Sequence, residues 1–257
     1  MTLLDRFSLD GETALVTGAA QGLGRAMASG LAEMGADVAI ADVNGEKAAT
    51  TATELDGETD VVAVETDVSD EASVKSMVET VTEELGPIDV LVNNAGIPAG
   101  GAAEETDFED WRDVMAVNLD GVFLCSKHVG RQMLDRGAGR IVNVSSMSAI
   151  DVNVPQKQAS YNASKAGVSM LTQSLAVEWA DRGVRVNAIA PGYMRTDLVD
   201  EVLENDPEME ETWLKNTPMG RLGRPEELQE LVVYLASEAS SYMTGSVVVI
   251  DGGYTSR

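Results

Sequence analysis

The chain has 257 residues and a formal net charge of -25, from 43 acidic residues against 18 basic ones. This length is compatible with one large α/β domain, and 44% hydrophobic residues are enough to bury a sizeable core. The acidity leaves no basic footprint for nucleic acid. One cysteine and one histidine exclude an intrachain disulfide and a metal site built from several thiolates or imidazoles, so no metal site is predicted.

No apolar run is long enough to span a bilayer, and the first residues lack the pattern of a signal peptide. We therefore expect a cytoplasmic protein without a membrane partner. An acidic, lysine-poor surface is typical of proteins that stay soluble in high salt, where ions screen the repulsion between like charges. A halophilic protein is our first interpretation, and an ordinary acidic cytosolic protein is the alternative.

A glycine-rich turn follows the first predicted strand, an apolar run over residues 13–18. Gly18 permits the tight turn, Gly22 lets the backbone approach a pyrophosphate, and Gly24 allows close packing of the next helix on the sheet. A second strand over residues 36–42 completes the unit. Strand, turn, helix and strand in this order indicate a dinucleotide site with the phosphates at the helix N-terminus. The alternative is a plain turn between strand and helix.

Asp42 ends the second predicted strand. A carboxylate at this position can bond both hydroxyls of the adenosine ribose and repels a 2′-phosphate. Gln21, in the glycine-rich turn, offers no cation to such a phosphate. Both features favour NAD over NADP, and the alternative for Asp42 is a solvated loop carboxylate.

The next strand patterns cover residues 61–68, 88–92 and 139–146. Asp67 and Val68, at the carboxyl end of the first of them, could hold an adenine. The small residues 93–96 follow the second strand and leave room for a ligand, while Asn93 is expected to tie neighbouring strands together. The third strand ends in hydroxyl groups at the same edge of the sheet.

Two helical regions carry the candidate catalytic groups. Residues 106–136 predict a helix pair in which Asn118 lies in an apolar stretch and needs partners for its amide, for example through an internal water in a kinked helix. Residues 160–181 predict a long helix with Tyr161 and Lys165 one turn apart on one face. A cation beside a phenol lowers the pKa of the phenol, so the pair can act as a general acid/base.

The remaining patterns predict a sixth strand over residues 184–190, a last helix from Arg224-Pro225, and a seventh strand over residues 247–253. Residues 197–217 are acidic and read as irregular, and a segment of this length is typical of a mobile lid. We find no linker and no internal repeat, so residues 1–257 are predicted to form one domain.

Together these motifs resemble the classical short-chain dehydrogenases/reductases over nearly the whole chain. The resemblance rests on Thr17-Gly18-x-x-x-Gly22-x-Gly24, Asn93-Asn94-Ala95-Gly96, Asn118, the serine after the fifth strand, Tyr161-x-x-x-Lys165 and Pro191-Gly192. It implies a single-domain α/β Rossmann fold, with a doubly wound seven-stranded parallel sheet and helices on both faces. It also implies a homotetramer.

The resemblance implies a role for each candidate residue. Tyr161 exchanges the alcohol proton, Lys165 lowers the pKa of Tyr161 and holds the nicotinamide ribose, and Asn118 holds a water in the proton relay. The residues and the resemblance together predict an NAD-binding set. It comprises Gly18, Gln21, Gly22, Leu23, Gly24, Asp42, Asp67, Val68, Asn94, Ala95, Gly96, Tyr161, Lys165, Pro191, Gly192, Met194 and Thr196.

One serine is expected to polarise the substrate oxygen. Spacing from Tyr161 selects Ser148, whereas position at the end of the fifth strand selects Ser146. We favour Ser146, with Ser148 and Gln158 as further substrate contacts.

The polar loop before Tyr161 resembles the polyol and sugar-acid branch of the family, such as mannitol, arabinitol and gluconate dehydrogenases. We therefore expect hydride transfer between NAD(H) and a secondary alcohol or ketone of a polyol, sugar or sugar acid. One alternative is a 3-oxoacyl-(carrier protein) reductase, which usually prefers NADP and needs a basic surface for its acidic carrier. An alternative of another class is a catalytically silent dinucleotide-binding regulator, which is expected to lack an active-site residue.

Overall fold

The computed structural model describes residues 2–55 and 57–257. A seven-stranded parallel sheet has the order β3-β2-β1-β4-β5-β6-β7, which confirms the predicted Rossmann fold. The strands are β1 (Thr13–Thr17), β2 (Asp37–Asp42), β3 (Val61–Glu65), β4 (Ile88–Asn93), β5 (Gly139–Val144), β6 (Val184–Pro191) and β7 (Val247–Ile250). The strand order reverses between β1 and β4, and ligands of such sheets bind at the carboxyl edge of that switch point.

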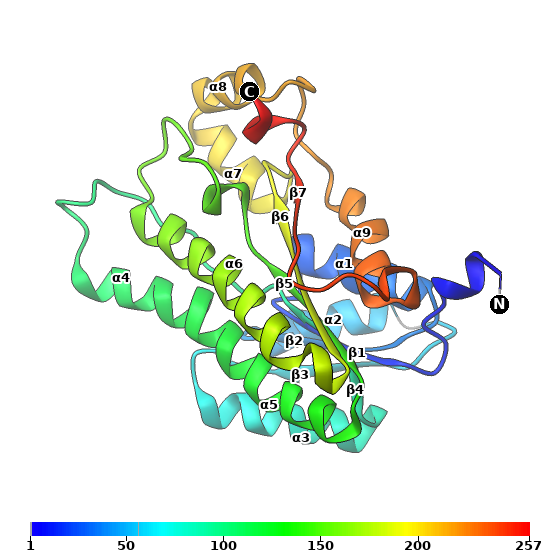
Figure 1. Cartoon of the computed structure of the whole chain (residues 1–257). Helices are drawn as coiled ribbons and strands as arrows, with labels where there is room; N and C mark the ends of the chain where they lie inside the picture. Colours follow the sequence, from blue (N-terminus) through cyan, green and yellow to red (C-terminus); the bar gives the residue numbers. More distant parts are fainter. Residues whose placement is uncertain (1, 56) are drawn as a thin grey trace.

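Helices cover both faces of the sheet (Figure 1). One face carries α1 (Gly22–Glu33), α2 (Gly45–Leu55) and α9 (Gln229–Ala236). The other carries α3 (Glu71–Leu85), α5 (Gly121–Arg136) and α6 (Ala159–Trp179). Each face has its own hydrophobic core, so the central strands are buried on both sides, and every residue of β1 is buried. This is why β1 reads as an unbroken apolar run rather than an alternating one. The described residues form no helix that is long and apolar enough to cross a membrane.

The predicted helix pair over residues 106–136 is one continuous helical stretch. Helix α4 (Phe108–Met115) passes through a π-helical segment (Ala116–Asp120) into α5, and the amide of Gly121 bonds the carbonyl of Ala116. A π segment widens the helix and re-aims its side chains. Here the segment carries Asn118, which is fully buried.

The segment over residues 197–217, predicted to be irregular, is helical. Helix α7 (Asp197–Asn205) begins after Thr196, whose hydroxyl accepts a hydrogen bond from the amide of Val199. Helix α8 (Pro207–Asn216) begins after Asp206, which caps it in the same way. The acidic composition led to the prediction of an irregular segment. The two capping residues favour helices instead, because each accepts a hydrogen bond from a free amide of the first turn. Figure 1 shows α7, α8 and the C-terminus beyond the carboxyl end of β6.

The last strand is shorter than predicted. It ends at Ile250, because Gly252 and Gly253 adopt positive φ angles of 63° and 90° and turn the chain. The short helix that follows carries Tyr254, which is completely buried and packs edge-on against the ring of Tyr193.

Candidate active site

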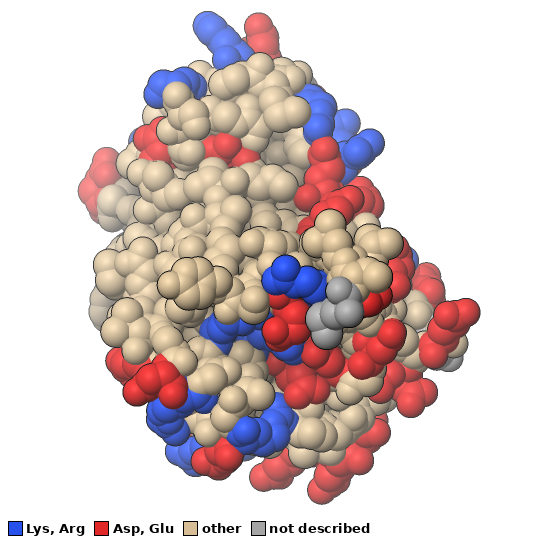
Figure 2. Space-filling model, turned by 45° about the vertical axis from the view of Figure 1, so that its right-hand side comes forward, with Lys and Arg blue, Asp and Glu red and all other residues tan. Residues whose placement is uncertain are grey.

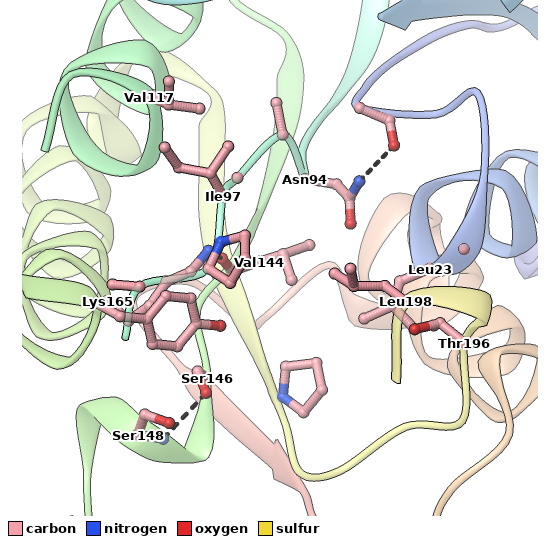
Figure 3. Close-up of a pocket in the computed structure, with 18 of the residues that line it drawn as sticks. Leu23, Asn94, Ile97, Val117, Val144, Ser146, Ser148, Lys165, Thr196 and Leu198 are labelled. Carbon is pink, nitrogen blue, oxygen red and sulfur yellow. Dashed lines mark hydrogen bonds between the residues drawn. The ribbon is translucent and has the colours of Figure 1, made fainter. Parts of the chain in front are cut away.

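A cavity of about 810 Å³ opens at the carboxyl edge of the sheet. Nearly all of the predicted cofactor, catalytic and substrate residues line it. The exceptions are Gly24 and Asn118, which lie behind its wall. Figure 3 shows Ser146, Ser148 and Lys165 on one side of the cavity and Leu23, Thr196 and Leu198 on the other. The topology therefore gathers residues from most of the chain at one place.

The N-terminus of α1 is suited to bind a phosphate. Its N-cap residue, Gln21, makes no capping hydrogen bond with its side chain, so the first amides of the helix are left without that partner. A Cβ atom on Gly22 would meet only Thr196, at 3.6 Å, so the backbone is open toward the cavity. A Cβ on Gly24 would lie 2.5 Å from the Asn94 side chain, so Gly24 serves packing behind the turn.

Asp42 lies half-buried at the adenosine end predicted for the cavity. Its two carboxylate oxygens accept hydrogen bonds from the amides of Ala20 (3.1 Å) and Asn44 (3.0 Å), which hold the carboxylate in place. Lys47 of α2 reaches the side chain of Gln21. Gln21 itself offers no cation, but this lysine brings one beside it from the next helix, which the sequence did not predict.

Asn93 and Asn94 connect neighbouring strands. The Asn93 amide donates to Asn143 on β5 (2.8 Å) and to Ser126 on α5 (3.0 Å), in agreement with its predicted structural role. The Asn94 amide donates to the carbonyls of Thr17 and Gly18 at 3.0 and 2.9 Å (Figure 3). Asn94 thus ties the end of β4 to the glycine-rich turn while lining the cavity.

Tyr161 and Lys165 lie one turn apart on α6, with the lysine Nζ 5.7 Å from the centre of the tyrosine ring. Burial raises the pKa of Tyr161, and the hydroxyl of Ser146 acts in the opposite direction. Burial also lowers the pKa of Lys165 to about 8, and its ammonium donates to the carbonyl of Val144 (2.9 Å). Desolvation therefore opposes charge on both groups, and the lowering of the tyrosine pKa by Lys165 stays a prediction.

The two candidate serines differ in how their hydroxyls are used. The Ser148 hydroxyl donates to Asn153 (2.7 Å) and accepts from Gln158 (3.3 Å). Ser146 only accepts from the backbone amide of Ser148 (3.1 Å), which leaves its proton for the tyrosine or a ligand. The geometry favours Ser146 as the group that polarises a substrate oxygen.

Asn118 uses its whole side-chain amide on protein groups. Its Oδ1 accepts from the amide of Ile97 (2.8 Å), and its Nδ2 donates to the carbonyl of Ile97 (3.0 Å) and to Ser164 (3.3 Å). The partners that this buried amide was predicted to need are thus supplied by protein groups. Asn118 clamps the loop after β4 against α6, next to Lys165.

Comparisons with known proteins agree with this geometry. The family described as Enoyl-(Acyl carrier protein) reductase matches residues 18–255. The galactitol 2-dehydrogenase (L-tagatose-forming) of Cereibacter sphaeroides is 47% identical, over 97% of this chain and 97% of that protein. The NADP-dependent mannitol dehydrogenase of Hypocrea jecorina is 44% identical, over 99% of this chain and 96% of its own.

A solved structure extends the match to three dimensions. The crystal structure of a gluconate 5-dehydrogenase from Burkholderia cenocepacia, in complex with NADP and tartrate, has a TM-score of 0.93 and 40% identity, and the match covers 100% of both chains. The chain is a classical short-chain dehydrogenase/reductase. The relatives also confirm its resemblance to the polyol and sugar-acid branch of that family.

The dehydrogenase has two aromatic residues in the cavity wall that sequence reasoning missed. Tyr193, just after β6, stacks on Trp213 of α8, with ring centres 4.1 Å apart and 11° between the planes. The Tyr193 hydroxyl accepts from Asn153 (3.1 Å) and donates to Gln156 (2.8 Å). The sequence offers one signal for this contact, which is Trp213 in an otherwise acidic segment. A tryptophan in such a segment needs an apolar surface on which to pack.

Proposed function

We propose that this dehydrogenase transfers a hydride between NAD(H) and a secondary alcohol or ketone of a polyol, sugar or sugar acid. One observation carries the proposal. Tyr161, Lys165 and Ser146 meet in the same cavity as the open N-terminus of α1 and the Asp42 carboxylate. A proton-transfer group and a dinucleotide site thus share one cavity, which hydride transfer from an alcohol requires.

Each residue then has a definite task. Tyr161 accepts the proton of the substrate hydroxyl during oxidation and returns it during reduction. Ser146 donates a hydrogen bond to the same oxygen, where charge develops in the transition state. Gly22 and its neighbouring amides hold the phosphates, and Lys165 holds the nicotinamide ribose. The bound nicotinamide would supply the hydride acceptor, and its positive charge would favour the phenolate form of Tyr161.

NAD rather than NADP is proposed because the fixed carboxylate of Asp42 repels a 2′-phosphate. Lys47 beside Gln21 is the opposing influence, and relatives include an NADP-dependent enzyme.

We expect Asp42→Ser to lower kcat/KM for NAD by about tenfold to a hundredfold and to raise it for NADP. Adding Lys47→Gln to that variant should remove the gain with NADP. Higher activity of the unmodified enzyme with NADP than with NAD would contradict this proposal.

The substrate class is supported by relatives that act on galactitol, mannitol and gluconate, and by polar side chains in the cavity wall. The test is formation of NADH with a panel of polyols and sugar acids, run with NAD and NADP in parallel. Turnover of a panel member is the expected result. If the panel is inert while 3-oxoacyl thioesters are reduced, the carrier-protein reductase alternative replaces this proposal.

The same assay tests the halophile proposal. Figure 2 shows acidic side chains crowded along one side of the surface, with few basic ones among them. Because salt screens repulsion between exposed like charges, activity and thermal stability should rise when salt is increased to molar concentration. Highest activity and stability at low salt would favour the ordinary acidic protein.

We also propose that α7 and α8 act as a substrate lid. Leu203 of α7 and Trp213 of α8 form a small hydrophobic cluster with Leu222, beside the two main cores. Segments with few contacts to the main cores open at low free-energy cost.

A homotetramer is a further proposal, supported by β7, whose outer edge has no neighbouring strand among the described residues. The single domain and the cytoplasmic location stay predictions.

A further inference from the structure

The charges that line the cavity are strongly unbalanced. Lys165 is the only cation among the lining residues, all of which the structure describes. It is buried, bonded to the carbonyl of Val144, and its pKa is already lowered by burial. The lining also includes the carboxylates of Asp42, Asp67, Asp113 and Asp197. Asp42 and Asp67 belong to the adenosine end predicted for the cofactor, so the substrate side is distinguished by what it lacks. A substrate carboxylate finds no free cationic side chain among the lining residues.

One arginine next to a cavity residue in the chain is paired with carboxylates of the protein. Arg195 precedes the cavity residue Thr196 in the chain, but its guanidinium pairs with Asp200 (3.4 Å) and with Glu210 on α8. Arg195 is not among the residues that line the cavity. A guanidinium placed in the cavity is the usual partner of a substrate carboxylate, because it can donate two parallel hydrogen bonds. This arginine is committed to joining the lid helices instead.

The substrate side of the cavity has a polar wall of neutral groups, formed by Ser148, Asn153, Gln156, Gln158 and Tyr193. Hydrogen bonds from Ser148 to Asn153, from Asn153 to Tyr193 and from Tyr193 to Gln156 join four of them into one chain. The Oε1 atom of Gln156 is used in this chain, so its amide nitrogen is left to donate.

The fifth member of this wall, Gln158, offers the opposite kind of group. Its amide nitrogen donates to Ser148 (3.3 Å) and Asn162 (3.0 Å), which leaves its oxygen to accept. The wall therefore presents fixed donors and acceptors side by side. A hydroxyl can serve both because it donates and accepts, whereas a carboxylate only accepts.

We propose that this cavity selects uncharged polyols and ketoses and rejects sugar acids. The inference rests on the proposed function and narrows its substrate class. Removing a carboxylate from water without a cationic partner is costly, and the acceptor oxygen of Gln158 would face another acceptor. The gluconate 5-dehydrogenase with a similar fold shows that the fold does not decide this preference. In this chain, the lack of a free cationic side chain and the acceptor oxygen of Gln158 decide it.

The first experiment compares galactitol, mannitol and threitol with D-gluconate, all with saturating NAD and at one fixed salt concentration. We expect kcat/KM for the best polyol to exceed that for gluconate by about a hundredfold or more. Equal or higher kcat/KM for gluconate would overturn the inference while leaving the proposed function intact. Failure of all four compounds, with reduction of 3-oxoacyl thioesters, would overturn the proposed function and this inference together.

The second experiment adds the missing charge. Gln158→Lys keeps a donor for Ser148 and Asn162 and introduces a cation, so kcat/KM for gluconate relative to the best polyol should rise by about tenfold. Gln158→Met is the matched control, similar in length but uncharged, and should weaken polyol turnover without favouring gluconate. Thermal melting identifies a variant that fails to fold. In that case the comparison of polyols with gluconate on the unmodified enzyme tests the inference. An unchanged preference in a folded Gln158→Lys enzyme would contradict the role of charge.

Discussion

Replacing Tyr161 with phenylalanine is expected to reduce kcat by about 10²–10⁴-fold, while the variant still binds NAD. The substitution removes only the hydroxyl, which is the group placed beside Ser146 in the cavity. The aromatic ring, with Lys165 at 5.7 Å from its centre, stays in place. Turnover measures the first effect, and titration with NAD measures the second.

Tyr234→Phe serves as the control, because Tyr234 is a partly buried tyrosine that packs near Phe7 and does not line the cavity. It should retain full turnover. If Tyr161→Phe also retains turnover, Tyr161 is not the acid/base. If neither the unmodified protein nor the variant turns over any substrate while both bind NAD, the silent regulator explains the chain better than an enzyme does.

Replacing Lys165 with methionine is expected to abolish turnover and, at neutral pH, to stabilise the protein without cofactor. Burial lowers the pKa of Lys165 from 10.5 to about 8. At neutral pH the lysine is charged in both states, and burying this charge destabilises the folded state relative to the unfolded one. A shift of this size corresponds to about 3 kcal/mol. Loss of the hydrogen bond to Val144 offsets about 1 kcal/mol of the gain.

The pH dependence of this gain distinguishes charge burial from ordinary repacking. Between pH 8 and 10.5 the unfolded chain binds more protons at Lys165 than the folded chain, so the free energy of unfolding of the unmodified protein rises with pH. The methionine variant lacks this term. Its advantage should therefore be largest below pH 8 and disappear by pH 10.5.

Denaturant unfolding of both proteins across this pH range is the measurement. Lys157→Met, at an exposed lysine, is the matched control and should show no such pH-dependent difference. A constant difference between the Lys165 variant and the unmodified protein at all pH values would mean that the ammonium is not buried in the folded state.

The sequence alone determined the sheet, the dinucleotide site and the residues that gather there. Buried parallel strands must be apolar on both faces, so β1 and its neighbours read as short apolar runs that end at Gly18, Asp42 and Asn94. Because parallel strands expose their carboxyl ends at one edge, residues that follow separate strands had to meet in one place. Tyr161 and Lys165 are four residues apart, and the helical repeat alone places them on one face of their helix.

Only the tertiary structure decided how these groups are used. The raised pKa of Tyr161 depends on its burial in the folded protein. Lys47 lies in the first turn of α2, after α1 and β2 in the chain, yet its side chain contacts Gln21. The stacking of Tyr193 on Trp213 joins β6 to a segment whose composition suggested an irregular lid. Local patterns report how a residue sits in its own strand or helix. They do not report which distant side chain desolvates it, pairs with it or packs on it, and in this dehydrogenase those contacts determine the chemistry.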